Sequence, residues 1–376
     1  MGMEKKYLIV NTGSSSHKYA LYHGSVELAN FSFEKKELDL ITDLAPADFL
    51  LKTLIAKKLI AEAEEIAWVC FRIVAPGDYI INNNIINEEY LANLGRVKEQ
   101  APLHIAPILD EIDSVKKLLP SAGLFGISDS YFHRNLPEVS ARYAIPEEDY
   151  LLGVKRYGYH GISIASVVGK IASLMGSIPD RIIVCHLGSG SSITAVKNGE
   201  SIDTSMGFTP LEGVPMGSRV GSIDPGALIY LGEEKGFGYK ELEKYLNEEC
   251  GSLGLSGKTK DTRDLIEFEK GGDAKARLAL NSYTYSIKKY IGAYVAALNG
   301  LDLLVFTGAL GERSSIMRSR ILSNLDALGI ILDREKNNEI ISKDGFIHSE
   351  KGSVKIVVIN TDEMAEMARE FRRLVA

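Results

Sequence analysis

Apolar positions along this chain follow two periods, and together they predict an α/β fold. Short apolar runs predict strands at 7–11, 67–74, 123–128, 181–187, 301–307 and 354–359. The stretch 276–298 carries apolar residues at steps of three and four and ends before Asn299-Gly300, which predicts a long helix. Further helices are predicted at 105–119, 163–175, 239–248, 315–328 and 363–374. Because hairpins interrupt the alternation, we expect mixed sheets rather than simple βαβ repeats.

Two distant stretches share the pattern of a strand, a turn rich in glycine and serine, and a second strand. The first, LIVNTGSSSHKYALYHG at 8–24, places Thr12, Gly13 and three serines at its tip and Lys18 on the returning strand. Hydroxyl groups, an approachable glycine backbone and an ammonium group indicate a phosphate-binding turn, with a plain polar hairpin as the alternative. The second, IIVCHLGSGSSITAVKNGES at 182–201, repeats the pattern. Two matching hairpins indicate a duplicated domain with a nucleotide held between the halves.

Length and composition narrow the class of protein. A chain of 376 residues is long for a single core, so we expect two domains. Its formal net charge of -7 argues against a nucleic-acid-binding surface. Cys70, Cys185 and Cys250 are too few for a disulfide framework and too scattered for a cysteine-rich zinc site, so we expect a reducing cytoplasm. Neither a targeting signal nor a membrane-spanning stretch is predicted.

Charged residues at the ends of predicted elements suit a polyphosphate and its metal ion. Asp129 follows the strand 123–128, and Glu363 opens the last helix. A strand-end turn residue is the alternative for Asp129, and complementarity to the helix dipole, shared with Asp362, is the alternative for Glu363. Arg72 interrupts the apolar run AWVCFRIVAPG, where burial requires either an ion pair or a functional role.

Predicted loops supply the remaining candidates for chemistry. Arg219 lies in MGSRVGSIDPG, a glycine-rich stretch without periodicity that predicts an exposed loop and favours a site over a core position. His160 lies in RYGYHGISIAS, between glycines and ahead of a helix. For His160, as for His104 in APLHIAP and His186 before the second hairpin, a structural role is the alternative.

Five stretches of this sequence resemble the acetate kinase family. They are LIVNTGSSSHKYALY, RYGYHGIS, CHLGSGSSITAVKNGESIDTSMGFTPLEGVPMGSRVGSIDPG, FTGALGERSS and NTDEMA. The resemblance covers nearly the whole chain in order, and the block from Cys185 to Gly226 is its most specific part. It implies the fold of sugar kinases, Hsp70 and actin, with two duplicated ribonuclease H-like α/β domains around an interdomain nucleotide cleft. The first domain would comprise 1–150 with 362–376, and the second 151–361.

The resemblance implies reversible phosphoryl transfer from ATP to acetate, giving acetyl phosphate and ADP, in a cytoplasmic homodimer that uses Mg²⁺ or Mn²⁺. Propionate is the close alternative to acetate. A carboxylate nucleophile is ionised at neutral pH, since its pKa is about 4, so the reaction needs no general base. The reaction needs residues that position the two reactants. It also needs cations, because the carboxylate and the polyphosphate are both anions and repel each other.

The resemblance also assigns roles to individual residues. The catalytic set is Arg72 and Arg219, which hold the carboxylate and the phosphoryl group, His160, which stabilises the transferring charge, and Asp129. Phosphate and nucleotide binding falls to Asn11, Ser14, Ser16, Lys18, His186, Gly188, Ser189, Gly190, Asp261, Arg263, Gly308, Ala309 and Gly311. The acid pocket would consist of Val74, Leu103, His104, Tyr159 and Pro210. The metal would be held by Asn11 and Glu363, with Asp129 helping to organise it.

Departures from the family's motifs gather where substrates are selected. His17 stands where the family has an apolar residue, and Ser189 replaces an asparagine. Ala309 and Arg313 stand in the glycine-rich loop that receives adenosine, where the family has glycine and asparagine. We expect the enzyme to use ATP with relaxed base selection. The alternative is a closed nucleotide pocket and a smaller donor such as pyrophosphate.

Two other classes of function remain beside an acyl-phosphate-forming kinase. A nucleotide-dependent switch or chaperone of the actin and Hsp70 type shares the fold, but it has no evident use for two arginines beside a small apolar pocket. A catalytically weak relative that acts through interactions is the third class, and Ala309 and Arg313 favour it. The kinase accounts for every charged residue assigned above and is the function we expect.

Overall fold

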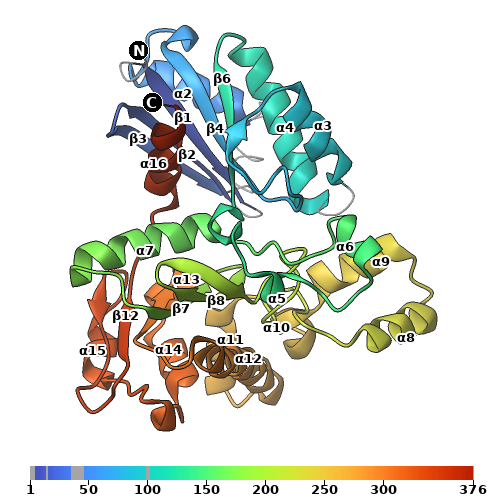
Figure 1. The fold of residues 1–376 in the computed structure, drawn as a ribbon, viewed down its shortest axis with the longest axis vertical. Helices are drawn as coiled ribbons and strands as arrows, with labels where there is room; N and C mark the ends of the chain where they lie inside the picture. Colours follow the sequence, from blue (N-terminus) through green and yellow to red (C-terminus); the bar gives the residue numbers. More distant parts are fainter. Residues whose placement is uncertain (1–4, 14–15, 35–45, 99–101, 376) are drawn as a thin grey trace. The chain divides into compact units, whose positions relative to one another are not determined.

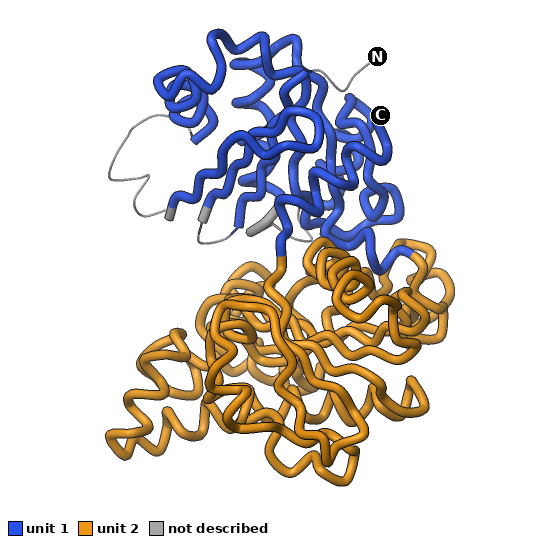
Figure 2. The backbone as a smooth tube through the Cα atoms, turned by 90° about the vertical axis from the view of Figure 1, so that its left-hand side faces the viewer, with its two compact units in different colours: residues 1–134, 362–376 blue, residues 135–361 orange. Residues whose placement is uncertain are grey.

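The computed structural model describes residues 5–13, 16–34, 46–98 and 102–375. Of the predicted site residues, Ser14 lies outside the described residues, as do the side chains of Ser16, Leu103 and His104. The chain forms two compact units (Figure 2): unit 1 comprises residues 1–134 and 362–376, and unit 2 comprises residues 135–361.

Unit 2 begins at Asn135, and the chain returns to unit 1 at Asp362. The domain bounds expected at residues 150 and 362 stay a prediction. Residues shortly after 134 have bonds within unit 2. Ser140 donates a hydrogen bond to the carbonyl of Ile202, and Arg142 forms an isolated β-bridge with Lys155.

Unit 1 contains a six-stranded sheet in the order β3-β2-β1-β4-β6-β5. The first three strands form an antiparallel meander, and β1, β4 and β6 are parallel. The strands are β1 (Lys6–Thr12), β2 (Ser16–His23), β3 (Val26–Glu34), β4 (Ile66–Ile73), β5 (Asn84–Ile85) and β6 (Gly123–Ser128). The helices are α2 (Pro46–Ala56), α3 (Glu88–Arg96), α4 (Pro102–Leu118) and α16 (Glu363–Val375), with 3₁₀ turns η1 (Ala63–Glu65) and η3 (Tyr131–His133).

The two faces of this sheet are covered by different helices (Figure 1). Leu8 and Val10 of β1 join the core that includes α2 and α4. On the other face Tyr7, Trp68 and Phe125, from three parallel strands, have their rings 4.9, 5.6 and 5.5 Å from the ring of Phe371 in α16. Because side chains alternate along a strand, every second residue after these three also lies on the face that α16 covers.

Unit 2 contains a six-stranded sheet in the order β11-β12-β10-β7-β8-β9. Its strands are β7 (Arg181–Leu187), β8 (Ser191–Lys197), β9 (Glu200–Thr204), β10 (Leu303–Thr307), β11 (Gly345–Phe346) and β12 (Lys355–Val358). Its helices are α5 (Glu138–Ala141), α6 (Glu147–Leu151), α7 (Gly161–Met175), α8 (Pro225–Lys235), α9 (Tyr239–Lys244), α10 (Gly251–Ser256), α11 (Thr262–Lys270), α12 (Ala274–Leu298), α13 (Gly308–Arg313), α14 (Ser315–Leu322) and α15 (Arg334–Glu339). Short turns are the π-helical η4 (Tyr245–Glu249) and the 3₁₀ turn η5 (Asp326–Leu328).

The two sheets repeat one topology. The meander β1-β2-β3 corresponds to β7-β8-β9, the parallel strands β4 and β6 correspond to β10 and β12, and a short antiparallel strand, β5 or β11, completes each edge. Both predicted hairpins are confirmed, and the repeat is the duplicated α/β architecture expected from the sequence. In unit 2 the long helix α12 packs on the face that carries Ile183, Cys185 and Leu187, while α7 runs along the opposite face (Figure 1).

Three local predictions are wrong. The helix predicted at 239–248 ends at Lys244 and continues as the π-helical turn η4. The helix predicted at 315–328 ends at Leu322, and Asn324 adopts a left-handed conformation with φ 59°. The stretch 308–313, expected as a glycine-rich loop, is the short helix α13. Within the described ranges no helix is both long and apolar enough to span a bilayer.

Candidate active site

Four polar residues of unit 1 meet at the carboxyl ends of the parallel strands. Asn11 follows Tyr7 and Ile9 on one face of β1, Arg72 follows Trp68 and Cys70 on β4, and Asp129 comes directly after β6. The alternation of side chains puts all three on the face covered by α16, whose first residue is Glu363. We call Asn11, Arg72, Asp129 and Glu363 the Arg72 cluster.

Hydrogen bonds connect every member of the Arg72 cluster. Arg72 binds Asp129 with two parallel bonds, from Nε to Oδ1 and from Nη2 to Oδ2, both at 3.0 Å. Its Nη1 donates to Asn11 Oδ1 at 3.2 Å and lies 4.0 Å from Glu363 Oε2. Asn11 Nδ2 donates to the same Glu363 oxygen at 2.7 Å. A bidentate arginine–carboxylate pair fixes geometry as well as charge.

Burial makes this pairing necessary. The side chains of Asp129 and Arg72 are 1% and 14% exposed. Burial alone lowers the pKa of the Arg72 guanidinium, but the charges of Asp129 and Glu363 outweigh burial and raise that pKa above its ordinary value. The ion-pair interpretation of Arg72 is therefore confirmed, and a role in binding substrate stays a prediction. Asp129 is more than a strand-end turn residue, since its carboxylate pairs with the guanidinium group of the buried arginine.

The first hairpin places its lysine beside the Arg72 cluster. Lys18 on β2 pairs directly with Asn11 on β1, so the two side chains lie on the same face of the sheet. Lys18 is exposed, and Val74, which follows β4, is half-buried. The roles of Lys18 and Val74 in binding remain predictions.

Two histidines of unit 2 lie face to face. His160 caps α7 in a left-handed conformation with φ 61°, which is uncommon for a residue with a Cβ atom. Its ring stacks on His186 at 4.1 Å between centroids. His160 Nδ1 lies 3.0 Å from Ser192 Oγ, and His186 Nδ1 lies 2.8 Å from Ser163 Oγ. Hydroxyl groups thus fix the orientation of both rings.

The second hairpin brings Arg219 to the same place. A Cβ atom added to Gly190 would lie 3.0 Å from His160 Nε2 and 3.8 Å from Arg219 Nη1. Arg219 Nη1 also donates to the carbonyl of Pro210 at 3.3 Å. Burial lowers the pKa of Arg219. We call His160, His186, Gly190 and Arg219 the His160 cluster.

The segment that carries Arg219 is not the exposed loop that the sequence predicted. Backbone hydrogen bonds tie it to η4 and α10: the carbonyls of Met216, Gly217 and Ser218 accept from Ser252, Leu253 and Cys250. The amide of Val220 donates to the carbonyl of Leu246 at 3.0 Å. Glycine-rich sequences give no periodic signal, so partners this distant along the chain were not predictable.

Two residues predicted for the acid pocket adjoin the His160 cluster. Tyr159 is 1% exposed and donates from its hydroxyl group to the carbonyl of Phe208 at 2.6 Å. Pro210 supplies the carbonyl that Arg219 binds. Leu103 and His104, predicted for the same pocket, have side chains outside the described part of the chain.

The glycines predicted for nucleotide binding lie against the end of β7. Gly308 has φ +76°, and a Cβ atom there would lie 2.7 Å from the carbonyl oxygen of Leu187, so the position requires glycine. A Cβ atom added to Gly311 would lie 3.8 Å from the carbonyl oxygen of Cys185. A Cβ atom on Gly188 would lie 3.5 Å from His186 Nε2. Ser189, Ala309 and Arg313, which depart from the motifs of the family that the sequence resembles, are exposed.

Asp261 and Arg263 pair with each other at the start of α11. The carboxylate of Asp261 caps the helix by accepting from the Arg263 amide at 2.8 Å, and it also accepts from Arg263 Nε at 3.0 Å. The Arg263 side chain is 88% exposed. A contact of either residue with a nucleotide stays a prediction.

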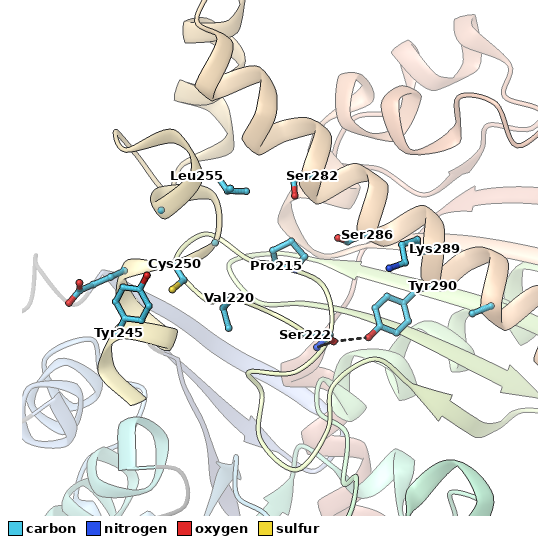
Figure 3. Close-up of a pocket in the computed structure, with 15 residues that line it drawn as sticks. Pro215, Val220, Ser222, Tyr245, Cys250, Leu255, Ser282, Ser286, Lys289 and Tyr290 are labelled. Atoms are coloured by element: carbon cyan, nitrogen blue, oxygen red, sulfur yellow. Dashed lines mark hydrogen bonds between the residues drawn. The ribbon is translucent and has the colours of Figure 1, made fainter. Parts of the chain in front are cut away.

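A cavity of about 680 Å³ lies behind the Arg219 segment (Figure 3). Pro215, Val220 and Ser222 of that segment face Tyr245 and Cys250, with α12 on the far side. Within the described residues, no side chain that the sequence assigned to the site lines this cavity. The residues predicted for the chemistry therefore lie outside the lining of this cavity.

Sequence reasoning overlooked the residues that fix the loop at 205–212. Arg156, Tyr143 and Glu212 interact with one another, although Glu212 is 56 residues from Arg156 and 69 from Tyr143 along the chain. Neither periodicity nor a motif marks such a set. Across the described residues, no group of three or more His, Cys, Asp and Glu side chains has an arrangement suited to a metal ion.

Comparisons with known proteins identify the family. The sequence model of the Acetokinase family matches residues 25–369. The chain is 37% identical to the acetate kinase of Bacillus cytotoxicus over 392 residues, which cover 98% of each chain.

Solved structures give the same result. The crystal structure of Porphyromonas gingivalis acetate kinase superposes with a TM-score of 0.85 at 34% identity, covering 99% of this chain and 100% of that one. A propionate kinase from Francisella tularensis gives a TM-score of 0.87 at 32% identity, covering 97% and 98%. These neighbours share the actin and Hsp70-like fold with two duplicated domains, and the chain belongs to the acetokinase family.

Proposed function

We propose that this chain catalyses reversible transfer of the γ-phosphoryl group of ATP to acetate, giving acetyl phosphate and ADP. As a member of its family it is a phosphotransferase with a carboxyl group as acceptor. A carboxylate oxygen forms a bond to the γ-phosphorus, the bond from phosphorus to the β,γ-bridging oxygen breaks, and its electron pair leaves with ADP. No proton changes place, so the residues have only to orient the reactants and neutralise charge.

The observation that carries the proposal is the approach of His160 and Arg219 to the tip of the second hairpin. Both lie within 4 Å of the Cβ position of Gly190, at 3.0 and 3.8 Å. A glycine turn, a guanidinium group and an imidazole together can bind the oxygens of a phosphoryl group. Arg219 would bind the anion, and His160 would stabilise the charge that develops during transfer.

Unit 1 supplies groups that suit magnesium. Mg²⁺ is held in kinases by one or two carboxylates, waters and substrate phosphates, so a full protein cage is unnecessary. Both oxygens of Asp129 are bound by Arg72, whereas Glu363 is 16% exposed. Glu363 and Asn11 would therefore hold the ion, and Asp129 would orient Arg72. The bound ion would neutralise phosphate charge.

The proposed acid is small. Tyr159 is buried next to His160 in the chain, and the carbonyl of Pro210 binds Arg219, which would bind the carboxylate. Propionate is the second candidate, because a propionate kinase is among the structures most similar to this chain. One methylene group in an apolar pocket changes selectivity by only about 10- to 200-fold, so both acids belong in the test.

ATP is the proposed donor. The methyl group of Ala309 and the side chain of Arg313 are exposed on α13, and Gly308 and Gly311 keep their close approach to β7. These positions support a nucleotide site with weakened base selection. GTP and pyrophosphate, compared with ATP under saturating acid, test this choice. Turnover with pyrophosphate and none with any nucleotide would contradict it.

We further propose a cytoplasmic homodimer. The three cysteines are free thiols, and Cys70 and Cys185 are completely buried, which suits a reducing compartment. Unit 2 exposes large apolar side chains, including Ile229, Tyr230 and Tyr285 at 68%, 61% and 65%. Light scattering after gel filtration would give twice the mass of the 41.2 kDa chain for a dimer.

The function is tested by trapping the product with hydroxylamine, which converts an acyl phosphate to a hydroxamate. With ATP and Mg²⁺, acetate is expected to give hydroxamate and ADP in equal amounts. Arg219→Ala serves as the matched inactive variant, so that contaminating kinases are detected. Wild-type protein that forms no hydroxamate with acetate or propionate, with any of the three donors, would contradict the proposal.

A further inference from the structure

Arg156 holds both ends of one loop in unit 2. Its Nη1 donates to the successive carbonyls of residues 204–206 at 3.2, 3.5 and 3.3 Å. Its Nη2 donates to Glu212 Oε1 at 2.9 Å. A single guanidinium group therefore closes the stretch 205–212, which we call the 205–212 loop.

Tyr143 adds a second tie across the same loop. Its hydroxyl group donates to Glu212 Oε2 and accepts from the amide of Phe208 at 2.9 Å. A Cβ atom added to Gly207 would lie 1.8 Å from that Glu212 oxygen, so the loop backbone packs directly on the pair. The Arg156 and Glu212 side chains are 16% and 32% exposed. We call Arg156, Tyr143 and Glu212 the Arg156 clamp.

The loop presents two carbonyl groups to residues of the proposed acid site. Phe208 accepts from the Tyr159 hydroxyl group at 2.6 Å, and Pro210 accepts from Arg219 Nη1 at 3.3 Å. Both carbonyls lie between the points that the clamp fixes. Because the clamp fixes the backbone of the loop, it also affects the positions of Tyr159 and Arg219, which bond to that backbone.

We propose that Arg156, Tyr143 and Glu212 are positioning residues that set the KM for the carboxylic acid. The inference rests on the proposed function, because acid binding by Tyr159 and Arg219 is part of that proposal. A loop held at both ends offers its carbonyls in one geometry, and a released loop lets the groups that it orients move. A set of residues that only stabilised the fold would change unfolding without changing the affinity for one substrate in particular.

The kinetic test compares Glu212→Ala with Asp302→Ala. Asp302 pairs with Arg181 at the start of β7, and its side chain is 32% exposed, as is that of Glu212. Glu212→Ala is expected to raise the KM for acetate about tenfold or more and to change the KM for ATP less than about twofold. Glu212→Gln keeps an acceptor for Tyr143 and should fall between. An acetate KM no higher than in Asp302→Ala, or equal rises for both substrates, would overturn the proposal.

A second measurement is independent of turnover. Tyr143→Phe removes the acceptor of the Phe208 amide, so hydrogen–deuterium exchange in the 205–212 loop should become about tenfold faster. Tyr22→Phe is the control, because Tyr22 also donates to a glutamate, Glu27 at 2.7 Å, but in unit 1. Unchanged exchange in Tyr143→Phe would overturn the clamp even in an active enzyme. Absence of turnover in the wild type with normal clamp behaviour would instead contradict the proposed function.

Discussion

The two units place polar residues at corresponding points of a repeated topology, but they give those points different charges. In unit 1, α16 covers one face of the sheet and contributes Glu363, and the strands beneath it contribute Asn11 and Arg72. In unit 2, α7 lies along the corresponding face, His160 caps it, and β7 contributes His186. One scaffold therefore builds two sites at the carboxyl ends of its central strands.

The charge balance of the two clusters is opposite. Carboxylates surround Arg72 and raise its pKa, so the Arg72 cluster carries more negative than positive groups and suits a cation. In the His160 cluster, burial lowers the pKa of Arg219, and its bond to Pro210 is to an uncharged carbonyl. A guanidinium group that donates to an uncharged carbonyl keeps its charge and can still attract an anion. We predict that the partners of each cluster, and not its position in the fold, decide what it binds.

On the other face of each sheet, the hairpin bonds to a carboxyl group in unit 1 and to a neutral hydroxyl group in unit 2. In unit 1, Tyr19 of β2 donates to Glu111 of α4 at 2.8 Å, and Thr12 also bonds to that buried carboxyl group. In unit 2, Ser191 of β8 lies 2.9 Å from the hydroxyl group of Tyr283 in α12. Each hairpin is thus tied to the helix beneath it, by an acid in unit 1 and by a neutral hydroxyl group in unit 2.

The largest expected effect on stability follows from removing the charge of Asp129. Asp129→Asn keeps the shape but leaves a buried arginine without its bidentate partner, which should lower the free energy of unfolding by about 3–5 kcal/mol. Urea denaturation measures it. Asp302→Asn, in a half-exposed pair, is the control and should cost about 0–1 kcal/mol. Equal losses in the two variants would contradict the structural role of the ion pair.

The next effect is a pH dependence that a buried carboxyl group of unit 1 contributes. Burial raises the pKa of Glu111 to about 7. The hydrogen bonds from Tyr19 and Thr12 lower this pKa and so partly oppose the effect of burial. The folded state therefore keeps a proton that the unfolded chain releases near its ordinary pKa of 4.5. Between these values the folded state binds more protons, so the free energy of unfolding should fall as pH rises, by up to about 3 kcal/mol.

Glu111→Gln should abolish this fall while keeping an acceptor for Tyr19. Glu27→Gln is the matched control, because Glu27 also accepts from a tyrosine of β2 but is exposed. Unfolding measured from pH 5 to about 8 distinguishes them. An unchanged slope in Glu111→Gln would show that another group titrates.

A smaller effect is expected for the neutral hydrogen bonds of unit 2. Ser192→Ala removes the hydroxyl group beside His160 Nδ1 and should cost about 0.5–1.5 kcal/mol of unfolding free energy. A loss as large as that of Asp129→Asn would mean that the His160 cluster, like the Arg72 cluster, depends on charge for its stability.

The smallest effect on stability is expected for Glu363→Gln. The substitution keeps the shape and removes a charge at the start of α16, which should cost only about 0.3–1 kcal/mol. Activity should nevertheless fall sharply, and the Mg²⁺ concentration for half-maximal rate should rise, because a metal ligand has lost its charge. An unchanged Mg²⁺ dependence would leave Glu363 with structural roles alone, as the partner of Asn11 and Arg72 and at the start of α16.

Much of the Arg72 cluster could be predicted from the sequence, because its members mark strand ends or interrupt apolar runs. Alternation along β1 and β4 places Asn11 and Arg72 on one face without any knowledge of their partners. The bidentate pairing of Arg72 with Asp129 could not be predicted. An arginine in an apolar run is expected both for a buried ion pair and for a residue that binds substrate. Repeated glycine–serine turns likewise predicted both hairpins and the duplication.

The Arg156 clamp and the bonds of the Arg219 segment could not be predicted. They join residues far apart in the chain through backbone carbonyls, which every residue has, so no residue type marks them. The helix α13 was missed because its glycines indicate a loop locally, whereas the close packing of Gly308 against Leu187 stabilises a helical turn. The helix α14 ends early because Ser323 leaves the helical conformation, with φ -63° and ψ 138°, and Asn324 after it is left-handed.

The contrast between the two arginines is the central claim, and turnover and unfolding measured together on Arg72→Ala and Arg219→Ala test it most directly. Both variants should lose about 100-fold or more in kcat/KM, since each removes a cation that a pair of anionic reactants needs. Arg72→Ala should also lose about 3–5 kcal/mol of unfolding free energy, because it leaves Asp129 buried without its partner. Arg219→Ala should lose less, about 1–3 kcal/mol, because it leaves the carbonyl of Pro210 without this donor but leaves no buried charge unpaired there. Near-normal turnover in Arg219→Ala, or equal losses of stability in the two variants, would contradict the account.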